Sequence, residues 1–476
     1  MSIILIRPMT PPTSSSGLVS IQYPINIGYL VSYLEQHKIG CAVLDFEVND
    51  FSEESFLASI AERKPSVVGI SCMTPHIIHG GTLARLVKEH FPDILTVLGG
   101  VHVSAIPEQT LREFPHFDVA VVGEGERTLL ELYKSWTESK KVVDIPGTAC
   151  RVGNSVRVNS PREMIQDINE VPFPSRDFIE PEKYKKSHVS RGFSRKTMNI
   201  VEITCSRGCP YDCIFCASKV VHTRNVRFRT PENIISEMEL LITKYNAQHF
   251  SFLDDTFTIR KRILVPVCEY MKSRNVTFDC FTRVNDIDYE KMAVMIAGGC
   301  KKISFGIESG SRKILKLIKK GITLEQVEKA FVIARKAGLE LIEGTFMVGN
   351  HPNETLEDIE LTKKLIWRLN PDIMAIFITI PYPGTEINRI LKEKKLLVKE
   401  NWEEFTLFFG EPSWQLGEVP MEDLIAITKK IFYSYYMRPC YIVSQILKIR
   451  SFKDVKYWFE LGLSFIKTKY DSLNKK

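Results

Sequence analysis

Length, composition and charge place this chain among globular proteins. Its 476 residues are too many for one ordinary core, and at roughly 150 residues per domain they predict two or three domains. A hydrophobic fraction of 44% and a charged fraction of 25% exclude a disordered or fibrous chain. A net charge of +6 is small for this length and indicates no partner by itself, and we expect no nucleic acid to be bound.

Two features bear on location. No apolar run reaches the roughly 18 residues that cross a bilayer, and the longest candidate, residues 373–380, ends at Pro381 and indicates a buried strand. The first residues, MSIILIRPMTPP, carry their apolar run before the only early arginine, unlike a signal peptide. A cytoplasmic protein is therefore expected, and its eleven cysteines are expected to be thiols or metal ligands.

Residues 1–139 alternate short buried strands with helices. The strands are expected at residues 3–6, 42–44, 67–71, 94–98 and 119–122. The helices are expected at residues 27–36, 56–63, 81–90 and 127–136. Five strands joined by crossover helices make an α/β, doubly wound (Rossmann-like) sheet, which binds ligands at the carboxyl ends of its strands. Residues 140–197 break into prolines, charges and polar turns, and predict a linker that contains a small hairpin.

A second alternating series occupies residues 198–395. Its strands are expected at residues 200–204, 249–253, 277–282, 302–306, 340–347 and 373–380. Its helices are expected to include residues 231–244, 324–337 and 355–369. Six strand and helix pairs predict a partial, TIM-like (β/α)6 barrel, with reactive residues just after the strands.

Residues 396–476 are predicted to be helical and rich in aromatic side chains. Between residues 440 and 476 there are eight Lys or Arg against three Asp or Glu. A helical tail that packs its aromatic side chains on the protein is the favoured interpretation. Peripheral contact with an anionic membrane surface is the alternative.

The segment VEITCSRGCPYDCIFC carries Cys209, Cys213 and Cys216 in a C-x3-C-x2-C spacing, directly after the first strand of the second series. Three thiolates can hold three irons of a cubane cluster and leave the fourth iron without a protein ligand. An open iron is a place where a substrate can bind.

Neighbouring residues refine this prediction. Gly208 and Pro210 suit the tight loop that wrapping a cluster demands. Cys205 supplies a fourth thiol. A structural zinc site usually takes paired short spacings from two loops, and an electron-transfer cluster takes a C-x2-C-x2-C run. Neither pattern is present, and the role of Cys205 is left open.

With this loop at the head of a partial barrel, the chain resembles the radical S-adenosylmethionine superfamily, including the aromatic Phe215 before the last cysteine, which the resemblance counts among the contacts of S-adenosylmethionine. The resemblance implies that Cys209, Cys213 and Cys216 hold a catalytic [4Fe–4S] cluster whose open iron binds S-adenosylmethionine. It also implies that an electron donor such as flavodoxin or ferredoxin drives release of a 5′-deoxyadenosyl radical.

The same resemblance assigns S-adenosylmethionine contacts to later strand ends. Asp254 and Asp255 are expected near the methionine amino group, and Arg283 near its carboxylate, since a guanidinium pairs well with a carboxylate. Glu308 is expected at the ribose hydroxyls, and Gly344 is expected to line the cavity.

The first domain lacks a G-x-G-x-x-G after its first strand, so a dinucleotide site is not expected. It resembles instead the cobalamin-binding class of the superfamily, through the segments GISCMT, LGGVH and VVGEGE. The resemblance implies cobalamin contacts at Ser71, Thr74, Gly99, Gly100, His102, Gly123 and Glu124. No D-x-H-x-x-G signature is present, which implies that no histidine binds the lower face of cobalt. The alternative is a scaffold that has lost its ligand.

The resemblance predicts a methyltransferase that acts on an unactivated carbon. A deoxyadenosyl radical removes a hydrogen atom from the substrate, and methylcobalamin supplies the methyl group. A first alternative is a cobalamin-dependent oxidative cyclase or rearrangement enzyme with a tetrapyrrole or lipid-like substrate, similar to the anaerobic magnesium-protoporphyrin monomethyl ester cyclase. A second is a non-catalytic sensor of cobalamin or of the iron–sulfur cluster. The expected substrate is a small molecule or, for the cyclase alternative, a tetrapyrrole or lipid-like molecule.

Overall fold

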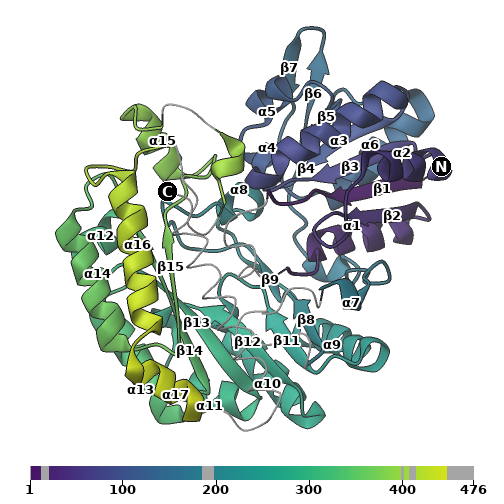
Figure 1. The fold of residues 1–476 in the computed structure, drawn as a ribbon. Helices are drawn as coiled ribbons and strands as arrows, with labels where there is room; N and C mark the ends of the chain where they lie inside the picture. Colours follow the sequence, from purple (N-terminus) through teal and green to yellow (C-terminus); the bar gives the residue numbers. More distant parts are fainter. Residues whose placement is uncertain (1, 12–20, 185–197, 398–400, 407–413, 448–476) are drawn as a thin grey trace.

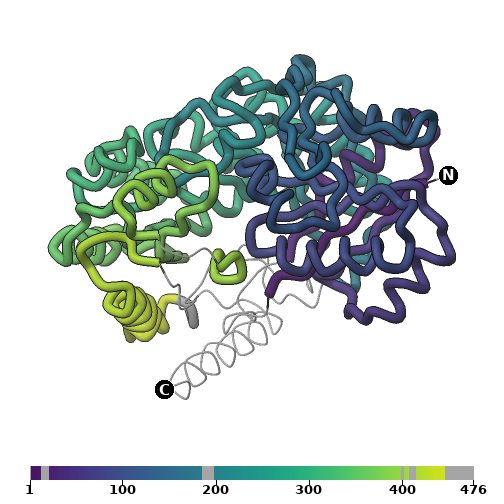
Figure 2. The backbone as a smooth tube through the Cα atoms, turned by 90° about the horizontal axis from the view of Figure 1, so that it is seen from above, coloured from purple at the N-terminus to yellow at the C-terminus, as the bar shows by residue number. Residues whose placement is uncertain are grey.

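The computed structural model describes residues 2–11, 21–184, 198–397, 401–406 and 414–447. These residues form two large sheets, each built mainly from parallel strands and covered by helices, and one two-stranded ladder (Figure 1). Viewed at right angles to this, the N-terminal part and the barrel lie side by side (Figure 2).

The first sheet has seven strands in the order β2-β1-β3-β4-β5-β6-β7. Its strands are β1 (Ser2–Arg7), β2 (Gly40–Asp45), β3 (Val67–Ser71), β4 (Leu95–Gly99), β5 (Val119–Val121), β6 (Thr148–Val152) and β7 (Ser155–Val158). Its helices are α1 (Ile25–Gln36), α2 (Glu53–Arg63), α3 (Ile77–His90), α4 (Val101–Ala105), α5 (Pro107–Glu113) and α6 (Glu126–Ser139), with a 3-10 turn η2 (Thr74–His76). The first strand pairs in parallel with both β2 and β3, so the strand order reverses there, as in a doubly wound sheet.

The predicted Rossmann-like sheet is confirmed, with one difference in the predicted linker. The hairpin of β6 and β7 extends the sheet, because β6 pairs antiparallel with β5 and buries Ala149 and Cys150 completely. The rest of this segment contains η3 (Ile168–Glu170) and the short helix α7 (Pro181–Tyr184). The helices α4 and α5 were not predicted from the sequence.

The second sheet runs in the order β15-β14-β13-β12-β11-β8, with all neighbours parallel. Its strands are β8 (Ile200–Ile203), β11 (His249–Phe252), β12 (Thr277–Thr282), β13 (Cys300–Glu308), β14 (Leu341–Val348) and β15 (Ile373–Ile378). Its helices are α9 (Pro231–Tyr245), α10 (Lys261–Arg274), α11 (Tyr289–Ala297), α12 (Arg312–Leu317), α13 (Leu324–Ala337), α14 (Leu356–Leu369) and α15 (Glu386–Glu393), with turns η4 (Phe257–Ile259) and η5 (Val284–Asp286). Thr323 and Thr355 close capping boxes that fix the starts of α13 and α14. The predicted six-stranded partial barrel is confirmed.

Between β8 and α9 lies a segment that we call the cysteine loop, residues 208–226. Its base is a two-stranded antiparallel ladder of β9 (Ser206–Arg207) and β10 (Arg227–Phe228), and it contains the short helix α8 (Ser218–His222). In Figure 1, α8 lies beside α4 of the first domain, so the loop is positioned at the junction of the two sheets.

After the barrel the chain forms η6 (Trp402–Glu404), α16 (Met421–Tyr436) and α17 (Pro439–Leu447). The helix α16 runs alongside β15 (Figure 1), and the Tyr436 hydroxyl donates to the Met374 carbonyl. Most of the basic, aromatic tail, residues 448–476, lies outside the described residues. Among the described residues, no helix has both the length and the apolar character that crossing a membrane requires.

Candidate active site

A cavity of about 560 Å³ lies between the carboxyl edges of the two sheets. Five of the seven residues predicted to contact cobalamin and two of the six predicted to contact S-adenosylmethionine line it. They are Ser71, Gly99, Gly100, Gly123, Glu124, Asp254 and Asp255. Strand ends that lie far apart in the sequence therefore meet at one place.

Glycines leave the first-domain wall of this cavity bare. A β-carbon added at Gly99 or Gly123 would meet no other atom within 4 Å, so the backbone there is open to a ligand. Gly100 has φ +102°, and a β-carbon there would lie 2.4 Å from the Cys72 carbonyl oxygen. Ser71 also lines the cavity, and its hydroxyl accepts a hydrogen bond from Asn26. This cradle fits a large ring that approaches the backbone.

Thr74 and His102 lie behind this wall. His102 Nδ1 is 3.3 Å from Thr74 Oγ1, and its ring packs edge-on against Trp402 of the C-terminal region at 4.8 Å. Burial lowers the pKa of His102 to about 4, so the ring is neutral near pH 7. Its Nε2 has no hydrogen-bond partner within the part of the chain that the structure describes. Both side chains pack behind the wall and do not line the cavity.

The cysteine loop brings Cys209, Cys213 and Cys216 together. Each thiol is close enough to another for their charges to interact. Burial raises the pKa of Cys216 to about 11. The Ser218 amide donates to Cys216 Sγ at 3.5 Å, a contact that favours a thiolate. Among the described residues, no three His, Cys, Asp or Glu side chains are close enough to surround a single ion. Three soft thiol ligands on one loop fit three irons of a cubane cluster.

Cys205 has different surroundings from these three thiols. Its side chain is only 3% exposed and belongs to the main hydrophobic core. Burial raises its pKa well above the usual range, and its charged neighbours are Asp254, Arg229 and Glu237. Its backbone amide donates to the Asp254 carboxylate at 3.0 Å. The residue therefore anchors the start of the loop through its backbone.

The two adjacent aspartates differ in what they contact. Asp254 is buried, and it accepts hydrogen bonds from the Cys205 amide and the Ser206 hydroxyl. Burial raises the pKa of Asp254 to about 6. Asp255 is exposed and accepts from the Ser218 hydroxyl at 2.5 Å. Asp255 is thus the better placed of the two to meet a cationic ligand.

Arg283 and Glu308 lie near the cysteine loop, although neither lines the large cavity. The Arg283 guanidinium stacks on the Tyr211 ring at 3.6 Å, donates to the Lys320 carbonyl and lies 3.9 Å from Cys213 Sγ. Glu308 has φ +72° and pairs with Lys320 at 2.6 Å, with both side chains buried. Strain at a non-glycine residue is frequent at functional sites.

Lys320 and Tyr211 were missed by sequence reasoning, although Lys320 precedes a glycine in KKGIT, a turn signal. The Lys320 ammonium is 5.8 Å from the ring of Phe215, which places that predicted residue near Glu308. Gly344 lies elsewhere. A β-carbon there would lie 2.9 Å from the Phe346 ring, so the residue faces the core between β14 and the helices.

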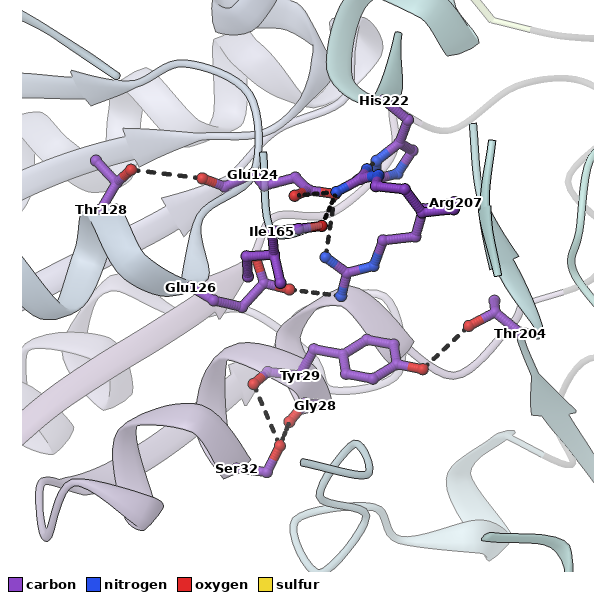
Figure 3. Close-up of polar contacts among 11 residues, drawn as sticks. Gly28, Tyr29, Ser32, Glu124, Glu126, Thr128, Ile165, Thr204, Arg207 and His222 are labelled. Atoms are coloured by element: carbon purple, nitrogen blue, oxygen red, sulfur yellow. Dashed lines mark hydrogen bonds and ion pairs between the residues drawn. The ribbon is translucent and has the colours of Figure 1, made fainter. Parts of the chain in front are cut away.

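Glu124 lines the cavity, but its carboxylate is held by cations of the barrel domain. Arg207 forms an ion pair with it, and His222 Nδ1 lies 3.3 Å away (Figure 3). Arg227 forms a second ion pair with the same carboxylate. Sequence reasoning did not anticipate this contact.

Two mainly parallel sheets thus meet at a shared cavity, with a three-cysteine loop at their junction. Residues 18–133 match the B12 binding domain, and residues 203–366 match the Radical SAM superfamily. The chain belongs to the cobalamin-binding class of the radical S-adenosylmethionine superfamily, whose cofactors are a [4Fe–4S] cluster, S-adenosylmethionine and cobalamin. The predicted family is confirmed.

The chain is similar to an uncharacterized methyltransferase of Pyrococcus horikoshii, with 31% identity over 455 residues, 95% of this chain and 96% of that protein. It is 30% identical over 380 residues to the anaerobic magnesium-protoporphyrin IX monomethyl ester cyclase of Rubrivivax gelatinosus, covering 78% of this chain and 66% of the cyclase. The solved structure of the cobalamin-dependent S-adenosylmethionine radical enzyme OxsB, 16% identical, superposes with a TM-score of 0.73 over 98% of this chain and 71% of that one. This last likeness concerns the fold.

Proposed function

We propose that the chain transfers a methyl group to an unactivated carbon of a small-molecule substrate. The cavity that touches the strand ends of both domains carries this proposal, because a substrate there would lie between the two proposed cofactor sites. When bound, the cofactors supply a radical that removes hydrogen from the substrate and a methyl group that replaces it. The similarity to an uncharacterized methyltransferase along almost the whole chain supports methyl transfer.

Different residues of the chain would bind the cluster and S-adenosylmethionine. Cys209, Cys213 and Cys216 would hold the cluster. Asp255 suits the amino group of S-adenosylmethionine, since it is exposed beside the cysteine loop and carries a carboxylate. Arg283 suits a carboxylate near Cys213.

Further residues shape the binding surface. Glu308, held by Lys320, would accept from hydroxyl groups. Ser71, Gly99, Gly100 and Gly123 would leave room for cobalamin. The apolar side chains of Ile70, Val97 and Val121 line the same cavity, so they would exclude water from a reactive radical.

Anaerobic reconstitution with iron, sulfide and hydroxocobalamin tests the proposal. With S-adenosylmethionine and a reductant, we expect 5′-deoxyadenosine from radical formation and S-adenosylhomocysteine from methyl donation. A Cys213→Ala variant is expected to lose deoxyadenosine. Deoxyadenosine without any S-adenosylhomocysteine would contradict a methyltransferase, and ligand binding without either product would indicate a sensor.

An oxidative cyclase is the second candidate, because the chain is 30% identical to the Rubrivivax cyclase. Magnesium-protoporphyrin IX monomethyl ester is the probe that separates the two reactions. A cyclase would convert this ester and form deoxyadenosine but no S-adenosylhomocysteine. A methyltransferase would form S-adenosylhomocysteine in the same assay.

A further inference from the structure

The carboxylate of Glu124 joins the first domain to the base of the cysteine loop. Arg227 grips it with two hydrogen bonds, at 2.9 and 2.7 Å, and Arg207 Nη1 lies at 3.2 Å. The three side chains are between 5% and 11% exposed. Figure 3 shows Glu124 extending from the first domain toward Arg207 and His222. A two-pronged contact from a buried guanidinium fixes both distance and orientation.

The loop's own architecture aims both arginines at one point. Arg207 and Arg227 are direct partners in the β9–β10 ladder that closes the base of the loop. Arg207 also donates to Glu126 at 2.6 Å, and Arg227 donates to the Ile165 carbonyl at 2.7 Å. Every one of these acceptors belongs to residues 124–165, outside the barrel.

Tyr29 completes the contact from another helix of the first domain. Its ring lies 5.0 Å from the Arg207 guanidinium, and its hydroxyl is 3.0 Å from the hydroxyl of Thr204, at the end of β8 (Figure 3). The base of the loop is therefore held by α1, by the turn before α6 and by the segment around Ile165.

Charge balance makes this contact depend on the docking of both domains. Two carboxylates, Glu124 and Glu126, face two guanidiniums, and a buried charge left without its partner is strongly unfavourable. Burial alone would raise the pKa of Glu124, but hydrogen bonds from His222 and Arg227 and the charge of Arg207 hold it well below its usual range. Separating the domains would expose these four charges to solvent or leave them buried without a partner.

We infer that Glu124 is a positioning residue that fixes the cysteine loop to the first domain and so sets the separation between the cluster and cobalamin. Cys209 is only two residues from Arg207, so a displacement at the base is transmitted to the cluster ligands. The inference rests on both cofactors being bound, and it does not require that the reaction be methyl transfer.

A Glu124→Gln variant of the full chain, loaded with both cofactors, tests this inference. After reduction, the cluster and cob(II)alamin each carry an unpaired spin, and pulsed dipolar electron paramagnetic resonance reports the distance between them. We expect iron, sulfide and cobalamin contents close to those of the unmodified protein, with a broader distance distribution shifted from the original maximum. The matched control is Glu131→Gln, which removes the same charge from the half-exposed partner of Arg162 on α6 and should leave the distribution unchanged.

An unchanged distribution in Glu124→Gln would overturn the inference, whatever happens to its stability. If that variant does not fold, Glu126→Gln removes one partner of Arg207 and leaves Glu124 in place. A smaller broadening is then expected, and an unchanged distribution would again overturn the inference. If the unmodified protein forms no S-adenosylhomocysteine while Glu124→Gln still broadens the distribution, the proposed methyl transfer fails and the positioning role stands.

Discussion

At the scale of single residues, Cys205 and Cys213 should respond differently to replacement. Cys205 is buried among core residues with Asp254, Arg229 and Glu237 as its charged neighbours. Cys213 instead lies 3.9 Å from the Arg283 guanidinium, and its charge affects Cys209. We expect Cys205→Ala to keep its iron and to lose about 1 kcal/mol of unfolding free energy, as for an ordinary buried side chain. Cys213→Ala should lose most of its iron. Iron and sulfide per chain after anaerobic reconstitution measure this, and equal losses in the two variants would show that Cys205 binds the cluster.

Glu354 gives a pH dependence that is independent of the cofactors. It is buried and accepts from the Asn350 amide at 2.8 Å, and burial raises its pKa from 4.5 to about 7. Folding therefore favours the protonated form. The stabilisation from this group is fully present below about pH 4.5 and is lost as pH rises through about 7, a change of about 3 kcal/mol.

Replacing Glu354 by the neutral glutamine should reduce the slope of unfolding free energy against pH. Denaturant unfolding of Glu354→Gln at about pH 5 and pH 8 should give more similar free energies than the unmodified protein does. The control Glu360→Gln changes an exposed carboxylate that pairs with Lys363, and it should keep the original slope. A slope that persists in Glu354→Gln would assign the pH dependence to another group.

The residues that sequence reasoning found and missed differ in a physical way. Cys209, Cys213 and Cys216 are recognisable because one short loop carries the whole pattern. The pairing of Glu124 with Arg227 spans more than a hundred residues and exists only once two domains have docked, so no local pattern encodes it. Lys320 was missed for a related reason, because its contact with Glu308 depends on how the chain returns after α12.

At the scale of elements, the cysteine loop depends on Gly208. This residue has φ +103°, and a β-carbon there would lie 2.7 Å from the Asn225 carbonyl oxygen. We expect Gly208→Ala to open the loop and to lower the iron content, since both the dihedral and the contact oppose a side chain. Gly153→Ala is the control, because Gly153 also has a positive φ but an added β-carbon meets nothing within 4 Å. Equal iron contents in the two variants would contradict the prediction.

Regular elements were predictable because their hydrophobic periodicity is local. The strands β3 and β12 have the predicted bounds, and the alternating burial of β14 matches a sheet with one face on the core. The hairpin of β6 and β7 was predicted as a hairpin but not as part of the sheet. Its place is set by pairing with β5, a contact that its own polar sequence does not specify.

At the scale of the whole molecule, the segment before the barrel ties the two domains together. Ser175 donates its amide to the Gly28 carbonyl of α1 at 3.0 Å, and a β-carbon on Gly28 would lie 2.7 Å from the Ser175 carbonyl oxygen. The next residue, Arg176, is buried and donates to the Glu202 carbonyl of β8 at 2.5 Å, with Glu237 of α9 at 3.5 Å. Adjacent residues thus bind opposite domains, which couples their unfolding.

We therefore expect the protein to unfold in one calorimetric transition, and Arg176→Gln to separate it into two. Losing hydrogen bonds from a buried charged group costs about 1.5–3 kcal/mol, and this cost falls on the contact between the domains rather than on either core. Arg157→Gln is the control, because Arg157 forms an exposed ion pair with Asp144 and its loss should cost less than about 1 kcal/mol. A single transition in Arg176→Gln, at the same temperature as in Arg157→Gln, would contradict this prediction. The contacts of Glu124 with Arg207, Arg227 and His222 would then hold the domains together without the segment around Arg176.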